Sequence, residues 1–271
     1  MNDKFMPNAL MFYREVTPPE EIAHLVLSFW EFAVKSESCE PIIHEIFPDG
    51  CISILYYRHQ NFVVNTLFIN ALTLEIFKTE VYAGDVFWGM RLSPAACAHV
   101  LRLNPAEVQP ESINDSEKFA HLTEGLLEKL VACRNFEEAI KIYETQIKTL
   151  ELAPRDVDGK VAEAVRIIEE NSGELKISEI AKILGLSARQ LERRFGKSAG
   201  LTPKQFVRAR RIRAAAVSLV EETEMNWANR AAAMGFADQA HLTHEFSTLT
   251  GRSPNSFAER VKKIEYGKLV K

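Results

Sequence analysis

Three side chains that could together carry out thiol chemistry lie close in the sequence: His44, Asp49 and Cys51. A cysteine attacks as its thiolate, so such a site needs a neighbouring base or a positive charge that lowers the thiol pKa. The chain contains no nucleophile elbow, no metal-spaced set of His and Cys, and no phosphate-binding loop. Pro48-Asp49-Gly50 is more typical of a tight turn. The sequence therefore predicts no enzyme, no metal site and no cofactor.

A second set of side chains could read hydrogen-bond donors and acceptors on a partner. Arg189, Glu192 and Arg193 are three and four residues apart, so they share one face of a predicted helix, opposite the apolar Leu191 and Phe195. An arginine fork bonds two acceptors at once, and a glutamate accepts from amino groups. We name these three residues the arginine face. The alternative is a solvated helix face whose charges pair locally, for instance Arg189 with Glu192.

A third set occurs about fifty residues later in the chain. It combines an amide, small residues and two imidazoles, and we name it the amide–imidazole face: Gln239, Ala240, His241, Thr243 and His244. A single histidine at such a place is usually a polar surface residue. Two of them, three residues apart and next to a glutamine, favour a contact with a polar partner.

Both faces lie at matching places in an internal repeat, which is the most informative feature of the chain. Residues 180–206 read IAKILGLSARQLERRFGKSAGLTPKQF, and residues 230–257 read RAAAMGFADQAHLTHEFSTLTGRSPNSF. The two units align at an offset of 50 up to a shared glycine and at 51 after it, because the second turn has one extra residue.

Each unit has the local signals of a helix, a sharp turn and a second helix. The first helix ends at Gly185 or Gly235, and glycine alone adopts positive φ without strain. Ser187 or Asp238 then provides an N-cap for the second helix. This is the pattern of a helix-turn-helix, whose second helix can enter the DNA major groove. A repeat that merely packs as a helical bundle or a solenoid is the weaker alternative, since solenoids need three or more repeats.

The repeat resembles the C-terminal domain of the AraC/XylS family of bacterial transcription regulators. The resemblance covers about residues 157–263, and its most specific part is the second unit with Gly235-Phe236, Asp238, His241-Leu242, Phe246 and Gly251-x-Ser253-Pro254-x-x-Phe257. It implies an all-α C-terminal domain with two helix-turn-helix units joined by a long helix, and double-stranded DNA as partner. One position departs from the family, because Arg230 stands where an aliphatic residue is usual.

The resemblance also implies roles for the two faces as base-edge contacts. Arginine suits guanine, glutamate suits cytosine, glutamine suits adenine, and threonine or alanine can touch a thymine methyl group. Arg193 is the strongest candidate, while Glu192 is expected either to contact a base or to orient an arginine. Gln190 and Lys197 are expected to contact phosphate or solvent.

A basic helix is predicted between the two units, over Pro203–Glu222. Twenty helical residues span roughly 30 Å, close to the ~34 Å of one duplex turn. One monomer could therefore place both recognition helices on the same side of DNA. Arg208, Arg211 and Arg213 on this helix are expected either to contact phosphate or to pair with the acidic N-terminal half.

Charge is distributed unevenly along the chain. Residues 1–154 hold 12 Lys and Arg against 22 Asp and Glu, and residues 155–271 hold 21 against 15, which together give the net charge of −4. Only the basic C-terminal half suits a polyanion. No apolar run is long enough to cross a membrane and no export signal begins the chain, so we expect a cytoplasmic protein that binds no membrane. Its cysteines are then expected to be reduced: Cys39, Cys51, Cys97 and Cys133.

The N-terminal half is predicted to be β-rich and then helical. Short stretches rich in β-branched and aromatic residues predict strands at Ile22–Val34, Ile42–Phe47, Cys51–Tyr57, Phe62–Phe68 and Val81–Gly89. These suggest a small sandwich or barrel. Helices are predicted from Ser93-Pro94 to Leu103, over Asp115–Cys133 and over Phe136–Leu150. The fold class is therefore α+β, with one domain at 1–154 and a second at 155–271.

The N-terminal half also resembles, at Phe47–Cys51 and Gly89–Pro94, a domain found in some AraC-type regulators. This implies a sensory or dimerising module, and RNA polymerase as a further partner of the regulator. We expect a DNA-binding regulator controlled by a small-molecule effector. One alternative is an N-terminal domain that binds a regulatory protein, and another is an enzyme fused to a DNA-binding domain. Arg91 is expected either to bind an anionic effector or to form a buried ion pair.

A leucine stripe lies on the predicted helices of residues 115–150, formed by Leu122, Leu126, Leu127 and Leu130. Such a stripe needs an apolar partner. Two partners are equally compatible with the sequence: the same stripe in a homodimer, or the β-sheet of the same chain.

Overall fold

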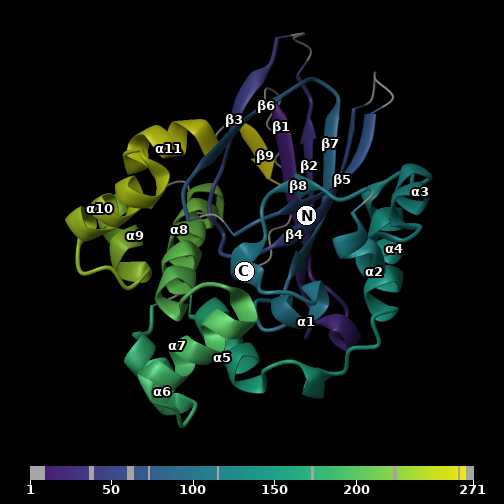
Figure 1. Cartoon of the computed structure of the whole chain (residues 1–271). Helices are drawn as coiled ribbons and strands as arrows, with labels where there is room; N and C mark the ends of the chain where they lie inside the picture. Colours follow the sequence, from purple (N-terminus) through teal and green to yellow (C-terminus); the bar gives the residue numbers. More distant parts are fainter. Residues whose placement is uncertain are drawn as a thin grey trace.

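The computed structural model describes residues 10–36, 40–59, 64–72, 74–114, 116–171, 174–221, 225–261 and 263–266. Its N-terminal half is a β-sheet with helices, and its C-terminal half is almost entirely helical, so the predicted α+β class is confirmed. The sheet lies between the helices of the N-terminal half on one side and those of the C-terminal half on the other (Figure 1).

One long sheet organises the N-terminal half. The strands are β1 (Met11–Val16), β2 (Val26–Val34), β3 (Ile42–Ile46), β4 (Ser53–His59), β5 (Val64–Asn70), β6 (Phe77–Val81), β7 (Asp85–Leu92), β8 (Glu111–Ser112) and β9 (Ile264–Tyr266). The long sheet has the order β8-β5-β4-β7-β2-β1-β9, and β3 pairs with β6 in a separate two-stranded sheet. The central β7 is buried along nearly its whole length, because both faces of the sheet are covered.

Short helices cover one face of this sheet. They are η1 (Glu20–Ile22), α1 (Cys97–Leu101), η2 (Pro105–Glu107), η3 (Glu117–Phe119), α2 (Ala120–Thr123), α3 (Leu126–Val131) and α4 (Phe136–Lys148). The α4 helix begins at Asn135, whose side chain accepts from the Glu138 N–H. It buries Tyr143 against the sheet, where the hydroxyl donates to the Trp88 carbonyl at 2.8 Å. The main hydrophobic core lies between these helices and the sheet.

The C-terminal half consists of η4 (Pro154–Asp156), α5 (Gly159–Glu170), α6 (Ile177–Ile183), α7 (Ala188–Ala199), α8 (Pro203–Glu221), α9 (Trp227–Ala233), α10 (Gln239–Thr250) and α11 (Pro254–Val261). It has a core in each helix-turn-helix unit. Cys51 and Ala95 complete the first core, and Phe47 packs against the second. The two halves of the chain therefore share apolar contacts, and the division at 154/155 stays a prediction.

The structure corrects several predicted elements. Strands β1 and β6 were not predicted, and the helix expected from Ser93-Pro94 begins only at Cys97. The helix expected over Asp115–Cys133 is divided into α2 and α3 at Gly125, whose φ is 64°.

The prediction of helix to the C-terminal end is wrong. Residues Ile264–Tyr266 form β9, which lies parallel to Met11–Tyr13 of β1 at the edge of the N-terminal sheet (Figure 1). An edge strand presents unpaired backbone groups, and β9 satisfies them on this edge. The last described residues thus return to the N-terminal half.

The leucine stripe packs inside its own chain. Leu122, Leu126 and Leu130 are buried in the main core, and Leu127 packs against it. The sequence left two alternatives open, and the structure supports the one in which the leucine stripe covers the β-sheet of its own chain. The stripe therefore does not support a homodimer, which stays a prediction.

Among the described residues, no helix has both the length and the apolar character needed to cross a membrane.

Candidate nucleic-acid interface

The α7 helix presents the arginine face to solvent. The Ser187 hydroxyl caps the helix by accepting from the Gln190 backbone N–H at 3.2 Å, and the side-chain Oε1 of Gln190 accepts from the Ser187 backbone N–H at 2.8 Å. This reciprocal capping box fixes where α7 begins. Leu191 and Phe195 are fully buried, so the opposite face of the helix points outward. All five residues predicted to contact DNA from this helix are exposed: Arg189, Gln190, Glu192, Arg193 and Lys197.

The α10 helix has the same construction. Asp238 caps it by accepting from the His241 N–H at 2.7 Å, and Leu242 and Phe246 are fully buried. In the amide–imidazole face, Thr243 is half-buried. The other four residues are exposed: Gln239, Ala240, His241 and His244. The structure thus brings together each predicted set on its own helix.

His241 has a second role within its turn. Its Nδ1 accepts from the Ala237 N–H at 3.4 Å, and its ring meets Phe236 edge to face, with 5.4 Å between the ring centroids. A ring that uses Nδ1 as an acceptor carries its neutral-state proton on Nε2. His241 therefore offers a hydrogen-bond donor beyond the turn.

Helix α8 joins the two units, and its arginines are engaged in contacts within the chain. Arg208 Nε donates to Glu245 of α10 at 2.8 Å, and Arg211 donates to the Glu174 carbonyl at 3.2 Å. Arg213 Nη2 donates to Glu15 of β1 at 2.6 Å. The sequence left open phosphate contacts or pairing with the acidic N-terminal half. Arg213 pairs with that half, whereas Arg208 and Arg211 bond Glu245 and Glu174 of the C-terminal half.

Arg230, the departure from the family pattern, is 1% exposed. Its Nε donates to the Met225 carbonyl at 3.0 Å and its Nη1 to Ser218 Oγ at 2.5 Å. Its guanidinium also lies 5.7 Å from the Trp227 ring centroid. A buried cation is tolerated when its donors are satisfied, so Arg230 joins α8 to α9 by hydrogen bonds instead of apolar packing.

The N-terminal half contacts both helix-turn-helix units. At the first unit, Gly200 at the end of α7 lies directly against the backbone of Pro105 and Ala106 in η2. At the second, Arg252 Nη2 donates to Glu45 of β3 at 2.5 Å. The second core continues this contact, because Phe47 and Phe257 meet edge to face. The spacing of the two units is therefore fixed by the N-terminal half as well as by α8.

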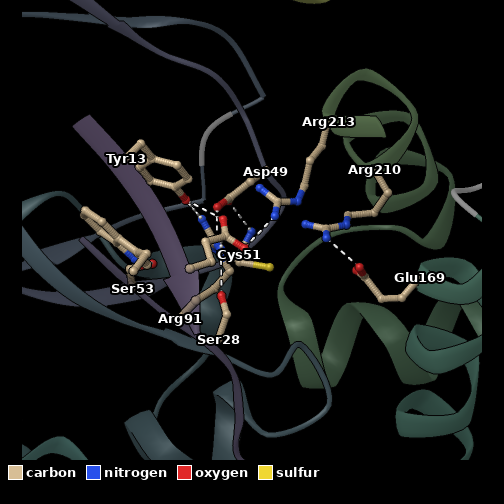
Figure 2. Close-up of polar contacts among 11 residues, drawn as sticks. Tyr13, Ser28, Asp49, Cys51, Ser53, Arg91, Glu169, Arg210 and Arg213 are labelled. Atoms are coloured by element: carbon tan, nitrogen blue, oxygen red, sulfur yellow. Dashed lines mark hydrogen bonds and ion pairs between the residues drawn. The ribbon is translucent and has the colours of Figure 1, made fainter. Parts of the chain in front are cut away.

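Glu15 is the centre of a buried ion cluster between the two halves. Its carboxylate accepts from Arg213, from Arg91 at 3.1 Å and from the Tyr13 hydroxyl. Arg91 Nε also donates to Asp49 at 2.7 Å. Figure 2 shows Arg213 reaching from α8 toward Tyr13, Asp49 and Arg91 of the N-terminal half. Arg91 thus forms a buried structural pair, one of the two roles that the sequence left open for it.

The three residues considered for thiol chemistry have other partners in the structure. Asp49 is engaged by Arg91, and the His44 ring packs against Phe32 in a tilted arrangement, with 4.4 Å between the ring centroids. Cys51 is buried, and burial together with the negative charge of Asp49 raises the pKa of its thiol well above the usual value. A thiol of raised pKa is a poor nucleophile.

Glu15, Glu45 and Arg252 hold the two halves together, and none of them was predicted to be functional. No local pattern marks them, since Glu15 and Glu45 are the only acidic residues of strands β1 and β3, and Arg252 lies in the turn between α10 and α11.

Gly200→Ala is expected to destabilise the chain by about 1–3 kcal/mol more than Gly185→Ala. Both glycines have positive φ, 77° and 68°, so alanine is strained at either position. A Cβ at Gly200 would lie 2.6 Å from the Ala106 backbone N, whereas nothing lies within 4 Å of one at Gly185. Urea unfolding of the full chain measures both losses. Equal losses would contradict the close contact between α7 and the N-terminal half.

Family models match both halves of the chain. A model described as a helix-turn-helix domain matches residues 180–260, and a domain of unknown function, DUF6597, matches residues 14–114. The first match includes both α7 and α10, and the second includes most of the β-sheet.

Known regulators are similar to part of the chain. The Msm operon regulatory protein of Streptococcus mutans is 27% identical over 125 residues, which are 46% of this chain and 45% of that protein. The HTH-type transcriptional regulator RipA of Corynebacterium glutamicum is 32% identical over 91 residues, 34% of this chain and 27% of that protein. The chain thus spans less than half the length of these two relatives.

A solved structure of a transcriptional regulator from Chromobacterium violaceum, described by its AraC-type DNA-binding domain, is 28% identical. The match covers 38% of this chain and 91% of that chain, with a TM-score of 0.34. The repeated helix-turn-helix, its capped recognition helices and the matches in both halves agree on one assignment. The two family matches support an AraC/XylS-family regulator, with a DUF6597 domain before its helix-turn-helix domain.

Proposed function

We propose that the protein is a sequence-specific DNA-binding transcription regulator that inserts α7 and α10 into successive major-groove faces. The observation that carries this proposal is the pair of capped helices, each with a buried apolar face and an exposed polar face, joined by α8. The 19 residues of α8 span about 28 Å, near the spacing of major-groove faces along one side of a duplex. Bending of the DNA meets any remaining difference.

On α7, Arg189 and Arg193 read guanine edges, and Glu192 accepts from cytosine or orients an arginine. Lys197 contacts phosphate. Gln190 also stands near the backbone of DNA, with its carbonyl retained by the capping box. Its remaining amide donors suit a phosphate oxygen.

On α10, Gln239 pairs with adenine, and Ala240 and Thr243 pack on thymine methyl groups. His241 and His244 donate to bases or phosphates. The two recognition helices thus have different chemistry, which predicts a site whose two half-sequences differ.

Selection from a pool of random duplexes with the full chain tests this function. We expect one sequence class to be enriched, with two conserved segments separated by about one helical turn. Binding to that class is expected to weaken as a power of salt concentration, since each neutralised phosphate releases counterions. A chain that enriches no sequence, or binds DNA with no dependence on salt, would contradict the proposal.

Control of this activity belongs to the N-terminal half in our proposal, and a small molecule is the favoured effector. The supporting observation is a cavity of about 650 Å³ whose lining is mainly apolar, includes several aromatic side chains and comes mostly from that half. A volume of this size and an apolar lining are typical of small-molecule sites. A regulatory protein is the second candidate, and the exposed Ile43 and Phe77 of the β3–β6 pair would be its contact. The proposal also includes RNA polymerase as a partner and a cytoplasmic location.

A further inference from the structure

The cavity lies between the sheet, the β3–β6 pair and the C-terminal half. Most of its lining is apolar, and the ring systems that surround it belong to Tyr13, Trp30, Phe32, His44, Phe47, Phe68, Phe77, Phe87 and Phe257. Planar rings pack favourably against such a lining, through stacked or edge-to-face contacts. A planar ring system therefore complements this surface.

The C-terminal half provides one wall of the cavity. Ile212, Arg213 and Val217 of α8 line it, together with Phe257 of α11 and Ile264 of β9. A molecule inside therefore contacts the sheet and the helix that joins the two helix-turn-helix units at the same time.

The charged groups of the buried end of the cavity already have partners of opposite charge. Arg91 and Arg213 face two carboxylates, those of Glu15 and Asp49, with N–O distances between 2.6 and 3.1 Å (Figure 2). The balance of charge at this end is neutral. A charged ligand group would have to break one of these pairs and leave another charge buried without a partner, which is costly.

At the β3 side of the cavity, the carboxylate of the lining is also engaged by cations, neither of which lines the cavity. Glu45 is paired with Arg252 at 2.5 Å and lies 3.6 Å from Lys78. Glu111, a further carboxylate of the lining, lies 3.6 Å from Lys118. Neutral polar groups line the cavity as well, among them Ser53 of β4 and Asn70 of β5, which are opposite each other in the strand register. A hydroxyl and a carboxamide suit a ligand with one uncharged polar group.

We propose that this cavity binds an uncharged, mainly aromatic small molecule, held between the N-terminal sheet and the α8 wall. This inference deepens the proposed function, since it names the effector class and how it reaches the DNA-binding half. A ligand that contacts both halves binds more tightly when the two halves are docked against each other than when they are separated. By linkage it then stabilises that arrangement, and with it the spacing of α7 and α10.

A matched pair of fluorescent probes tests the ligand class. N-phenyl-1-naphthylamine and 8-anilinonaphthalene-1-sulfonate share the same rings, but only the second carries a negative charge. Both become brighter in apolar sites, so titration of the full chain gives an affinity for each. We expect the uncharged probe to bind the cavity at least about ten-fold more tightly, about 1.4 kcal/mol.

Variants that fill the cavity from either side assign the probe to it. Leu55→Trp fills it from β4 and Val217→Trp fills it from α8, since both side chains are in its lining. Each is expected to weaken binding of the uncharged probe by at least about ten-fold. Ile43→Trp is the matched control, because Ile43 is 50% exposed and outside the lining. It is expected to leave probe affinity unchanged. Thermal unfolding of each variant checks that it is folded.

Three results would overturn the inference. One is equal or tighter binding of the sulfonate probe at the site that Leu55→Trp blocks. Another is wild-type affinity for the uncharged probe in both folded filling variants. The third is loss of binding in Leu55→Trp but not in a folded Val217→Trp, which would exclude the α8 wall. Because these titrations contain no DNA, their outcome is independent of the duplex selection that tests the proposed function.

Discussion

Glu15→Gln is expected to lower the free energy of unfolding by about 3–5 kcal/mol at neutral pH. Glutamine keeps the shape of the side chain but removes the charge that Arg91 and Arg213 share. Glu15 is 1% exposed, so both guanidinium groups would keep the cost of burial and lose their common partner. Urea unfolding of the full chain, followed by circular dichroism, measures the loss.

The pH dependence of this loss is a second test of the same prediction. Burial alone would raise the pKa of Glu15, but the charges of Arg213 and Arg91, with hydrogen bonds from Tyr13 and Arg213, lower it from 4.5 to about 2. A lowered native pKa gives stability that is present above the unfolded pKa and is lost as the pH falls through the native pKa. The difference between the wild-type chain and Glu15→Gln is therefore expected to shrink from about pH 4.5 toward pH 2.

Glu163→Gln is the matched control for this prediction. Glu163 pairs with Arg166 at 2.6 Å, but both side chains are about half exposed. Solvent screens such pairs, so a loss of about 0–1 kcal/mol is expected. If Glu15→Gln costs no more than this control, the cluster does not hold the two halves together.

Arg193→Ala is expected to weaken binding to the selected DNA sequence by about 1–3 kcal/mol, which is roughly 5- to 150-fold. The reason is the loss of a guanidinium fork from the exposed face of α7. Binding to random duplexes is expected to fall much less, because it depends on phosphate contacts. Fluorescence anisotropy with labelled duplexes measures both affinities at one fixed salt concentration.

Arg166→Ala is the control for this experiment. Arg166 is exposed on α5, where it bonds Glu163 and Glu170 instead of lying on a recognition helix. Its removal is expected to leave the preference for the selected sequence intact. Equal losses on selected and random DNA for Arg193→Ala would identify Arg193 as a phosphate contact.

The sequence by itself determined the two helix-turn-helix units of the C-terminal half. Its signals are local: an apolar pair four residues apart, a glycine at the turn, and a capping residue such as Ser187 or Asp238. All of them lie within one helix-turn-helix unit of fewer than thirty residues, and the same pattern occurs twice. The exposure of Arg193 and His244 follows from the same spacing, since burial of one helix face leaves the other face outward.

Only the tertiary structure decided how the two halves meet. Glu15 and Arg213 are separated by 198 positions, and Glu45 and Arg252 by 207, so no local pattern could pair them. Strand β9 is a short segment whose partner is the edge of β1, at the other end of the chain. Its pairing depends on that edge and not on its own residues. The cavity likewise forms only where α8 closes over the sheet. Contacts between distant segments carry these features, whereas the recognition helices depend on their own residues.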